Sequence, residues 1–230
     1  MIQNPSAYEE AHVLLDEISS ILPKTLDGQE AIMDMKENNS ANWRQMEWIG
    51  FWFEHFVETK VVPTMGGSRG PTFGRTTFDF KKNFVWDLKA HPMGDKNIIL
   101  NDESAIRSCI EQFGGLGFIV VEGIAKYDDS ESSFKKWHDN LKGGTSVYEK
   151  KRVERGAKSR SRKVSFQPYS VLAIWFENLE QIDHARALGT LKLFQVGMRN
   201  SNGKDRAAKY QLNLDLIPPE NKLAKIYIQN

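Results

Sequence analysis

The hydrophobic pattern of the first sixty residues has the period of α-helices. Residues 8–22 carry apolar side chains at helical spacing, and the pattern ends at Pro23. Residues 27–38 predict a short second helix, and residues 42–60 predict a longer helix that is apolar around more than half of its circumference. The apolar positions are Val13, Leu14, Ile18, Ile21 and Leu22 in the first helix and Trp43, Met46, Ile49, Phe53 and Val57 in the longer one.

From residue 76 onward the pattern alternates between strands and helices. Residues 76–91 predict an apolar β-hairpin after the glycine-rich segment 63–74, and residues 116–127 are β-rich throughout, as in a central strand. Further helices are expected over residues 101–113 (with Asn101 or Asp102 as N-cap), 132–141 and 178–188, and further strands over residues 170–176, 190–196 and 209–217. This order predicts an α/β sandwich with a central mixed β-sheet flanked by helices.

Length and composition limit the class of protein. With 230 residues the chain is long enough for one domain with a substantial core, and no stretch is apolar for long enough to cross a membrane. The first twenty residues are too acidic for a signal or transit peptide, so we expect a cytoplasmic protein. The single cysteine, Cys109, lies among apolar residues of an expected helix, which favours a buried and unreactive thiol.

Charge is unevenly distributed along the chain, although the net charge is only +1. Residues 149–163 have eight basic side chains against two acids, a net of +6, and the remainder has 23 basic and 28 acidic residues, a net of −5. The basic residues of this segment are Lys150, Lys151, Arg152, Arg155, Lys158, Arg160, Arg162 and Lys163. A local basic surface on an acidic body is typical of proteins that bind polyanions, and a disordered, solvated loop is the alternative.

The predicted hairpin contains charged residues that an apolar strand normally excludes, since burying an unpaired charge is costly. The tripeptide acid-x-Lys occurs six times in the chain, but only Asp79 and Asp87 lie in strand-like apolar runs. A three-residue loop centred on Asn83, which tolerates a left-handed backbone, would oppose Asp79 to Asp87 and Thr77 to Lys89. Opposed side chains have Cβ atoms about 4.5–5.5 Å apart, so two carboxylates there repel unless a cation lies between them.

Two carboxylates at this separation suit Mg²⁺, which binds one or two protein carboxylates and completes its octahedron with water and phosphate oxygens. Lys89 follows Asp87 by two residues and therefore lies on the same face of its strand, close to the ion. An ammonium group there can orient a water molecule or neutralise charge that develops on a phosphate. The alternative is a one-sided hairpin on which Asp79, Asp87 and Lys89 face solvent.

A helix with Glu54, a hairpin with Asp79 and Asp87-Leu88-Lys89, and then a helix and a buried strand resemble the catalytic core of the PD-(D/E)xK nucleases, in particular the type II restriction endonucleases. The resemblance covers residues 42–127. It implies a restriction-endonuclease-like sandwich, one nuclease domain over residues 1–230, and a Mg²⁺-dependent, site-specific deoxyribonuclease. Phe78 stands where the motif has proline, and the interval from Asp79 to Asp87 is short compared with most members.

The resemblance also implies roles for the site residues. By it, Asp79 and Asp87 bind Mg²⁺, Lys89 positions or activates the attacking water, and Glu54 holds an outer-shell water or a second ion. The implied products carry a 5′-phosphate and a 3′-hydroxyl, the enzyme is expected to be a homodimer, and a cognate DNA methyltransferase is expected as a genetic neighbour. The alternative for Glu54 is the solvated face of its helix. Gly50 lies one turn earlier on the same face, where glycine weakens a helix by about 1 kcal/mol unless something packs closely against it.

DNA-recognition elements are expected within residues 140–215. The basic segment 149–163 would contact phosphates, which give affinity, while residues 198–210 offer side chains suited to base edges. Those side chains are Arg199, Asn200, Asn202, Lys204 and Arg206. The alternative for this second segment is an Asn-Gly turn between two strands.

Two other functions remain open from the sequence. One is a nuclease of the same core that acts in DNA repair or recombination, and the other is a non-catalytic DNA-binding protein whose hairpin acids are surface charges. His91 follows Lys89 by two residues and is expected at a strand end, within reach of a phosphate. His55 and His138 have no partners at ligand spacing, so no zinc site is predicted.

Overall fold

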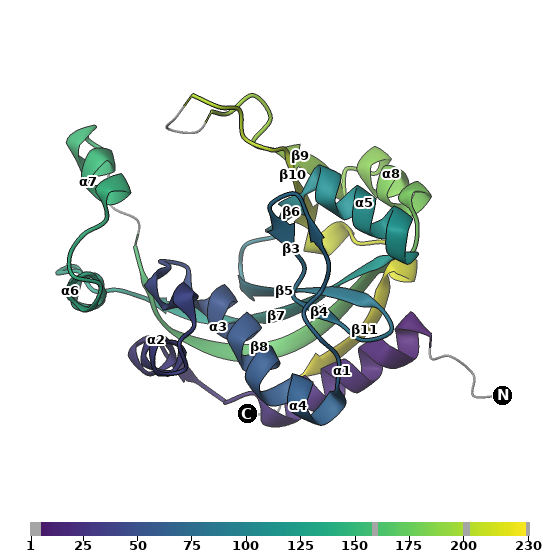
Figure 1. Ribbon diagram of the computed structural model, residues 1–230, viewed down its shortest axis with the longest axis horizontal. Helices are drawn as coiled ribbons and strands as arrows, with labels where there is room; N and C mark the ends of the chain where they lie inside the picture. The colour runs from purple at the N-terminus through teal and green to yellow at the C-terminus, as the bar shows by residue number, and fades with distance from the viewer. Residues whose placement is uncertain (1–5, 158–160, 200–202, 229–230) are drawn as a thin grey trace.

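A curled mixed β-sheet lies at the centre of the protein in the computed structural model, which describes residues 6–157, 161–199 and 203–228 (Figure 1). The strand order is β1-β8-β7-β5-β4, and β11 also pairs with β8. These strands are β1 (Leu26–Asp27), β4 (Phe80–Lys81), β5 (Val85–Pro92), β7 (Leu116–Tyr127), β8 (Lys163–Phe176) and β11 (Lys222–Tyr227). Strands β5 and β7 run parallel and the other neighbours run antiparallel, so the predicted mixed α/β architecture is confirmed.

Helices cover both faces of this sheet (Figure 1). The helices α1 (Ala7–Ile21), α2 (Gly28–Glu37) and α3 (Trp48–Phe56) pack on one face, and α5 (Glu103–Phe113) and α8 (Leu179–Ala187) pack on the other. Successive residues of a strand point to opposite faces. Trp86 and Leu88 therefore enter the core under α3, while Val85 enters the core under α5. Cys109 of α5 is buried in that second core, as predicted.

Smaller elements complete the fold. A three-stranded antiparallel sheet in the order β6-β10-β9 is formed by β6 (Asn97–Asp102), β10 (Lys209–Asn213) and β9 (Leu191–Phe194). The hairpin of β2 (Thr72–Phe73) and β3 (Thr76–Thr77) precedes β4. Short helical segments are η1 (Ala41–Arg44), η2 (Val57–Val61), α4 (Val62–Met65), η3 (Leu214–Leu216) and η4 (Pro219–Asn221).

Two arms project from the same side of the molecule (Figure 1). One is formed by α6 (Ser133–Leu141) and α7 (Val147–Glu154), and the other is the connection from β9 to β10. We call them the α6–α7 arm and the β9–β10 arm. Strand β5 lies between their bases (Figure 1).

The helices differ from the sequence prediction in their buried face and their limits. Helix α1 forms as expected, but Val13 and Ile21 are 54% and 40% exposed, and the buried stripe includes Ala11 and Glu10 instead. The single helix expected over residues 42–60 is interrupted, because the chain forms the 3₁₀ segment η1, then extends, and starts α3 only at Trp48. Its last turn widens into the π-helix η2, a local distortion that is frequent at functional sites.

Three further segments add to the sequence prediction. Strand β6 forms where no strand is expected, and its last residues are the expected N-cap; Asp102 does occupy the N-cap position of α5, but its side chain accepts no capping bond. Strand β11 was not predicted. The basic segment, for which a disordered loop is the alternative, includes the end of helix α7 and the beginning of β8. Within the described residues, no helix is long and apolar enough to cross a membrane.

Candidate active site at the edge of strand β5

The hairpin of β4 and β5 has the predicted register. A three-residue loop centred on Asn83 joins the strands, and Phe80 pairs with Trp86. Asn83 has no left-handed backbone, however, since the described non-glycine residues with positive φ are Asn39, Ser132 and Gln195. The expected pairing of Thr77 with Lys89 is also wrong: Thr77 pairs with Thr72 in the preceding hairpin, and Lys89 lies beside Val120 of the parallel strand β7.

The Asp79 side chain takes the place of a strand partner at the edge of β5, just beyond the end of the short strand β4. Only Val85 and Trp86 of β5 pair with β4, so the edge beyond them lacks a partner strand on this side in the described part of the chain. The carboxylate of Asp79 accepts a hydrogen bond from the backbone N–H of Leu88, at 2.8 Å from Oδ2. Asp79 is thereby held beside Asp87, the residue that the register places opposite it.

Asp87 and Lys89 form a buried network with Asn101 of β6. The Asp87 side chain is 1% exposed, and its Oδ2 forms an ion pair with the Lys89 ammonium. Asn101 donates from Nδ2 to Asp87 Oδ1 at 2.7 Å and accepts at Oδ1 from Lys89 Nζ at 3.1 Å. The amide group therefore fixes both charged side chains at once.

Glu54 of α3 belongs electrostatically to the same cluster. Burial raises the pKa of Glu54 to about 7; the nearby charge of Lys89 opposes this rise and that of Asp87 adds to it. Burial, followed by the charges of Asp87 and Glu54, raises the pKa of Asp79 to about 9. Burial opposes the charged form of Lys89, but the carboxylates of Asp87 and Asp79 outweigh it and raise the pKa of the ammonium. Three acids thus share one buried lysine.

Two cavities reach this cluster from different sides. One, of about 600 Å³, is lined by Glu54 and Asp79 together with Arg69 and Glu58. The other, of about 620 Å³, is lined by Lys89 together with residues that include Gly50. We call them the Glu54 cavity and the Lys89 cavity. The cluster is therefore accessible to a substrate although its side chains are mostly buried.

Gly50 leaves the helix face open beside Lys89. A Cβ atom built on Gly50 would have no atom within 4 Å, apart from the backbone of its own helix and its two neighbours in the chain. The close packing that would compensate for a glycine in a helix is thus absent at this position. The missing side chain instead enlarges the Lys89 cavity.

The donor set of this cluster fits Mg²⁺. Asp79 and Asp87 offer hard carboxylate oxygens, and two such ligands are what Mg²⁺ typically takes from a protein, with water and phosphate oxygens for the rest. The described residues contain no group of three or more histidine, cysteine, aspartate or glutamate side chains that could by themselves hold a metal ion. Two carboxylate ligands match a cation that keeps most of its water, rather than a closed structural site.

Three of the five histidines, His55, His91 and His138, lie beside other groups of the fold. His91 lines the Lys89 cavity, but its Nε2 lies 2.6 Å from the carbonyl oxygen of Asp95, which accepts its hydrogen bond. His138 likewise donates from Nε2 to the carbonyl of Trp43 at 2.9 Å. His55 lies 3.8 Å from a carboxylate oxygen of Asp34.

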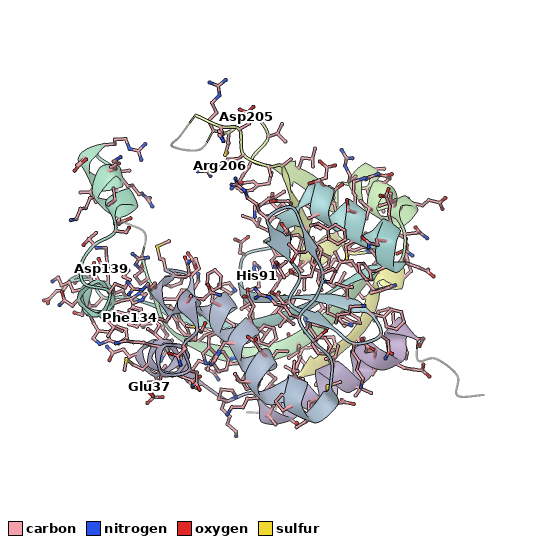
Figure 2. All side chains as sticks on the ribbon, in the orientation of Figure 1. Glu37, His91, Phe134, Asp139, Asp205 and Arg206 are labelled. Carbon is pink, nitrogen blue, oxygen red and sulfur yellow. The ribbon has the colours of Figure 1, made fainter. Side chains whose placement is uncertain are left out.

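The residues predicted to contact DNA lie on the two arms and at their bases. Lys150, Lys151 and Arg155 are exposed on or just after α7, and Arg152 is half-buried. On the β9–β10 arm, Arg199 and Lys204 are exposed and Arg206 is half-buried. Figure 2 places Arg206 and Asp139, one at each arm, on opposite sides of the opening above His91.

Some of these residues are not available as predicted. Arg162 is buried, and Lys163 forms an ion pair with Glu47 at 2.5 Å. Arg199 lies 3.5 Å from Asp205 on its own arm. Lys158, Arg160, Asn200 and Asn202 lie outside the described residues.

Sequence reasoning missed two residues of the cluster. Asn101 was read as a helix N-cap, although the alternation of Ile98 and Leu100 before it would have indicated a strand. Arg69 lies in the glycine-rich segment, where its charge lowers the pKa of Glu54, and no local pattern singles it out.

No family model, no curated protein and no solved structure matches this chain. Its function must therefore be argued from the site.

Proposed function

We propose that this protein is a Mg²⁺-dependent DNA endonuclease whose active site is the cluster of Glu54, Asp79, Asp87 and Lys89. The observation that carries the proposal is the Asp87–Lys89–Asn101 network, in which Lys89 lines the Lys89 cavity and the half-buried acids Glu54 and Asp79 lie nearby. A half-buried lysine among several carboxylates suits reactions in which negative charge develops on a phosphate. A solvated hairpin, the alternative reading, does not account for an Asp87 side chain that is 1% exposed.

Each residue has a role that follows from its contacts. Asp79 and Asp87 would hold Mg²⁺, which when bound supplies positive charge and Lewis acidity at the scissile phosphate. The Lys89 ammonium has three protons, and its described contacts to Asp87 and Asn101 use two of them. The third can be donated to a water molecule or phosphate oxygen in the Lys89 cavity. Glu54 would accept a hydrogen bond from water on the other side of the cluster.

The two arms support DNA as the substrate. They project on the same side of the molecule, with β5 between their bases, and both carry exposed cations (Figure 1). A duplex held between them would place its backbone over the Lys89 cavity. Cations on α7 would contribute phosphate contacts, and the β9–β10 arm would contribute contacts to base edges.

The finer assignment within this proposal is a type II restriction endonuclease with a restriction-endonuclease-like sandwich. It rests on the order helix, hairpin, helix and central strand around the site, which is the order of α3, β4–β5, α5 and β7, with strand β6 added between β5 and α5. Double-strand cleavage at a palindromic sequence then favours a homodimer, because a two-fold axis presents the same site to both strands.

The test is cleavage of unmethylated phage DNA by the purified chain, with Mg²⁺ or with EDTA, followed on a gel. We expect discrete fragments that require Mg²⁺. The Asp87→Asn variant keeps the shape of the side chain but removes its charge, and we expect it to cleave roughly 10²–10³-fold more slowly. Asp215→Asn, an exposed acid that pairs with Lys96, is the matched control and should cleave normally.

The outcomes separate the candidate functions. A smear of fragments with the same dependence on Mg²⁺ and Asp87 would replace the restriction reading by a repair or recombination nuclease. Intact DNA under every condition, with the wild-type chain folded by circular dichroism, would overturn the nuclease proposal. Equal cleavage by the wild-type chain and Asp87→Asn would show that the active site is not this cluster.

A further inference from the structure

A second cavity at the base of the α6–α7 arm is strongly basic. It has a volume of about 410 Å³ and is lined by Arg44, Lys142, Arg152 and Arg162, with Glu149 as the one acid. We call it the Arg162 pocket. Four cations against one acid in so small a space attract an anion.

Arg162 is the unusual member of this pocket. Its side chain is buried, with the residue 5% exposed, yet its Nε and Nη1 atoms have no hydrogen-bond partner. A buried guanidinium without partners is costly, so polar groups of this kind are normally satisfied by protein, water or a bound ion. The five N–H groups of arginine form a planar fork that matches the oxygens of a phosphate.

Two of the carboxylates near Arg162 are paired with other cations. Asp139 accepts from Lys135 at 3.0 Å and pairs with Lys142 at 2.9 Å, and Glu47 pairs with Lys163. These acids lower the cost of burying Arg162 through their charge, but none of them forms a hydrogen bond to its Nε or Nη1.

The N-terminus of α7 also faces this pocket. Gly144 and the N-cap residue Ser146 line it, and the partial positive charge of a helix N-terminus favours an anion there. The N-terminus of α7 adds to the attraction for an anion, but the buried Arg162 guanidinium without hydrogen-bond partners is what defines the site.

The Arg162 pocket borders the Lys89 cavity. Met46 and Arg162 line the pocket, whereas the next residues in the chain, Glu47 and Lys163, line the Lys89 cavity. A polymer with regularly spaced phosphates could therefore occupy both.

We propose that the Arg162 pocket is a phosphate-binding site, with Arg162 as its central ligand and Arg44 and Arg152 at its rim. Its natural ligand is a backbone phosphate of the DNA that lies in the Lys89 cavity; this identification of the ligand rests on the proposed function, while the affinity for phosphate does not.

The test compares wild-type protein with Arg162→Gln in two binding assays without Mg²⁺. Inorganic phosphate is titrated against thermal unfolding, and a short DNA duplex is titrated by fluorescence anisotropy at several salt concentrations. We expect Arg162→Gln to lose the phosphate-dependent rise in melting temperature and to bind the duplex roughly tenfold more weakly, with a salt slope smaller by about one.

Matched variants keep the test valid if Arg162→Gln is unstable. Arg44→Gln and Arg152→Gln change less buried residues at the rim and should each weaken phosphate binding. Arg155→Gln changes a neighbouring exposed arginine that does not line the pocket, and it should bind inorganic phosphate like the wild-type chain.

Each outcome decides one part of the proposal. Loss of both phosphate and duplex binding supports the site and its ligand. Loss of phosphate binding with unchanged duplex affinity supports a site for free phosphate and overturns the DNA backbone as its ligand. If the wild-type chain binds phosphate but no duplex, the proposed function is wrong and the phosphate-binding site stands. If all three pocket variants bind phosphate and duplex like the wild-type chain, the pocket is not a phosphate-binding site.

Discussion

Two buried carboxylates, Glu10 and Asp87, lie at the β4–β5 hairpin. Neutral donors surround the first, and charged groups surround the second. Glu10 of α1, which is 4% exposed, accepts hydrogen bonds from the backbone N–H groups of Asn83 and Phe84 and from the side chains of Asn83 and Trp86, at 2.6–3.2 Å. Asp87, which is 1% exposed, is bound by the charged Lys89 and by Asn101, with Glu54 and Asp79 nearby.

The difference separates a structural acid from the acid that we propose for catalysis. Glu10 is surrounded by neutral donors, and by accepting their hydrogen bonds it holds the loop of the hairpin in place. The Asp87 cluster instead gathers like charges, which burial and mutual repulsion make costly. Natural proteins retain such a cost at sites where a ligand or a reaction compensates for it. The predictions below test this contrast.

The largest effect is expected from Glu10→Ala. Removing this carboxylate leaves several buried donors without an acceptor, and each unsatisfied group costs about 1–3 kcal/mol. We expect the free energy of unfolding to fall by about 3 kcal/mol or more, measured by urea denaturation, with cleavage lost only where the hairpin no longer folds. Asp87→Asn should instead slow cleavage roughly 10²–10³-fold and lower stability less than Glu10→Ala does, because relief of the repulsion from Asp79 and Glu54 offsets part of the lost ion pair with Lys89. A strong loss of stability in both variants, or in neither, would remove the distinction.

An intermediate effect is expected from Asn101→Ala. Asn101 acts through Lys89 and Asp87, so it is a positioning residue, and its loss removes two hydrogen bonds while the ion pair remains. We expect stability to fall by about 1–2 kcal/mol. The single-turnover cleavage rate should fall roughly tenfold, which corresponds to about 1.4 kcal/mol, with unchanged duplex affinity.

The control for this prediction is Ile21→Ala, a 40% exposed position at the end of α1 that lines neither the Glu54 cavity nor the Lys89 cavity. It should leave both stability and cleavage close to wild type. A purely structural role for Asn101 would lower stability and leave the cleavage rate of the folded fraction unchanged, and that result would contradict the prediction.

The smallest effect is expected from Gly50→Ala, where stability and activity should change in opposite directions. A Cβ at Gly50 meets no atom outside its own helix and chain neighbours, so the helix should gain about 1 kcal/mol in thermal unfolding. The added methyl group enters the Lys89 cavity, so cleavage should slow several-fold. If cleavage is unchanged while stability rises, the substrate does not approach this helix face.

Local patterns predicted most helices and strands and the register of the β4–β5 hairpin. The reason given for the hairpin loop was wrong. The loop centred on Asn83 was assigned to the left-handed tolerance of asparagine, yet the loop is held by Glu10, more than seventy positions earlier in the chain. Likewise, Trp48 begins α3 only after an interruption, and its indole donates to the carbonyl of Lys163, a distant strand residue. Neither interaction could be predicted from the residues next to Asn83 or Trp48 in the sequence.

The same limit applies to the candidate site. The spacing of Asp79, Asp87 and Lys89 follows from one hairpin, so a local register argument could bring them together. Asn101 and Arg69 join them from other segments, and the Arg162 pocket joins η1, the start of α7 and the start of β8. The sequence predicts Arg162 as one of eight similar phosphate contacts in a basic segment, whereas the fold buries it and separates it from the others.

The sequence by itself determined most helices and strands of the core, the mixed α/β class and the pairing of the hairpin, because periodicity and short loops are local properties of the chain. The tertiary structure alone decided which charged groups lose their water and which neighbours they meet. That decision depends on contacts between residues far apart in sequence, and it is what distinguishes Glu10 as a structural acid from Asp87 as a candidate for chemistry.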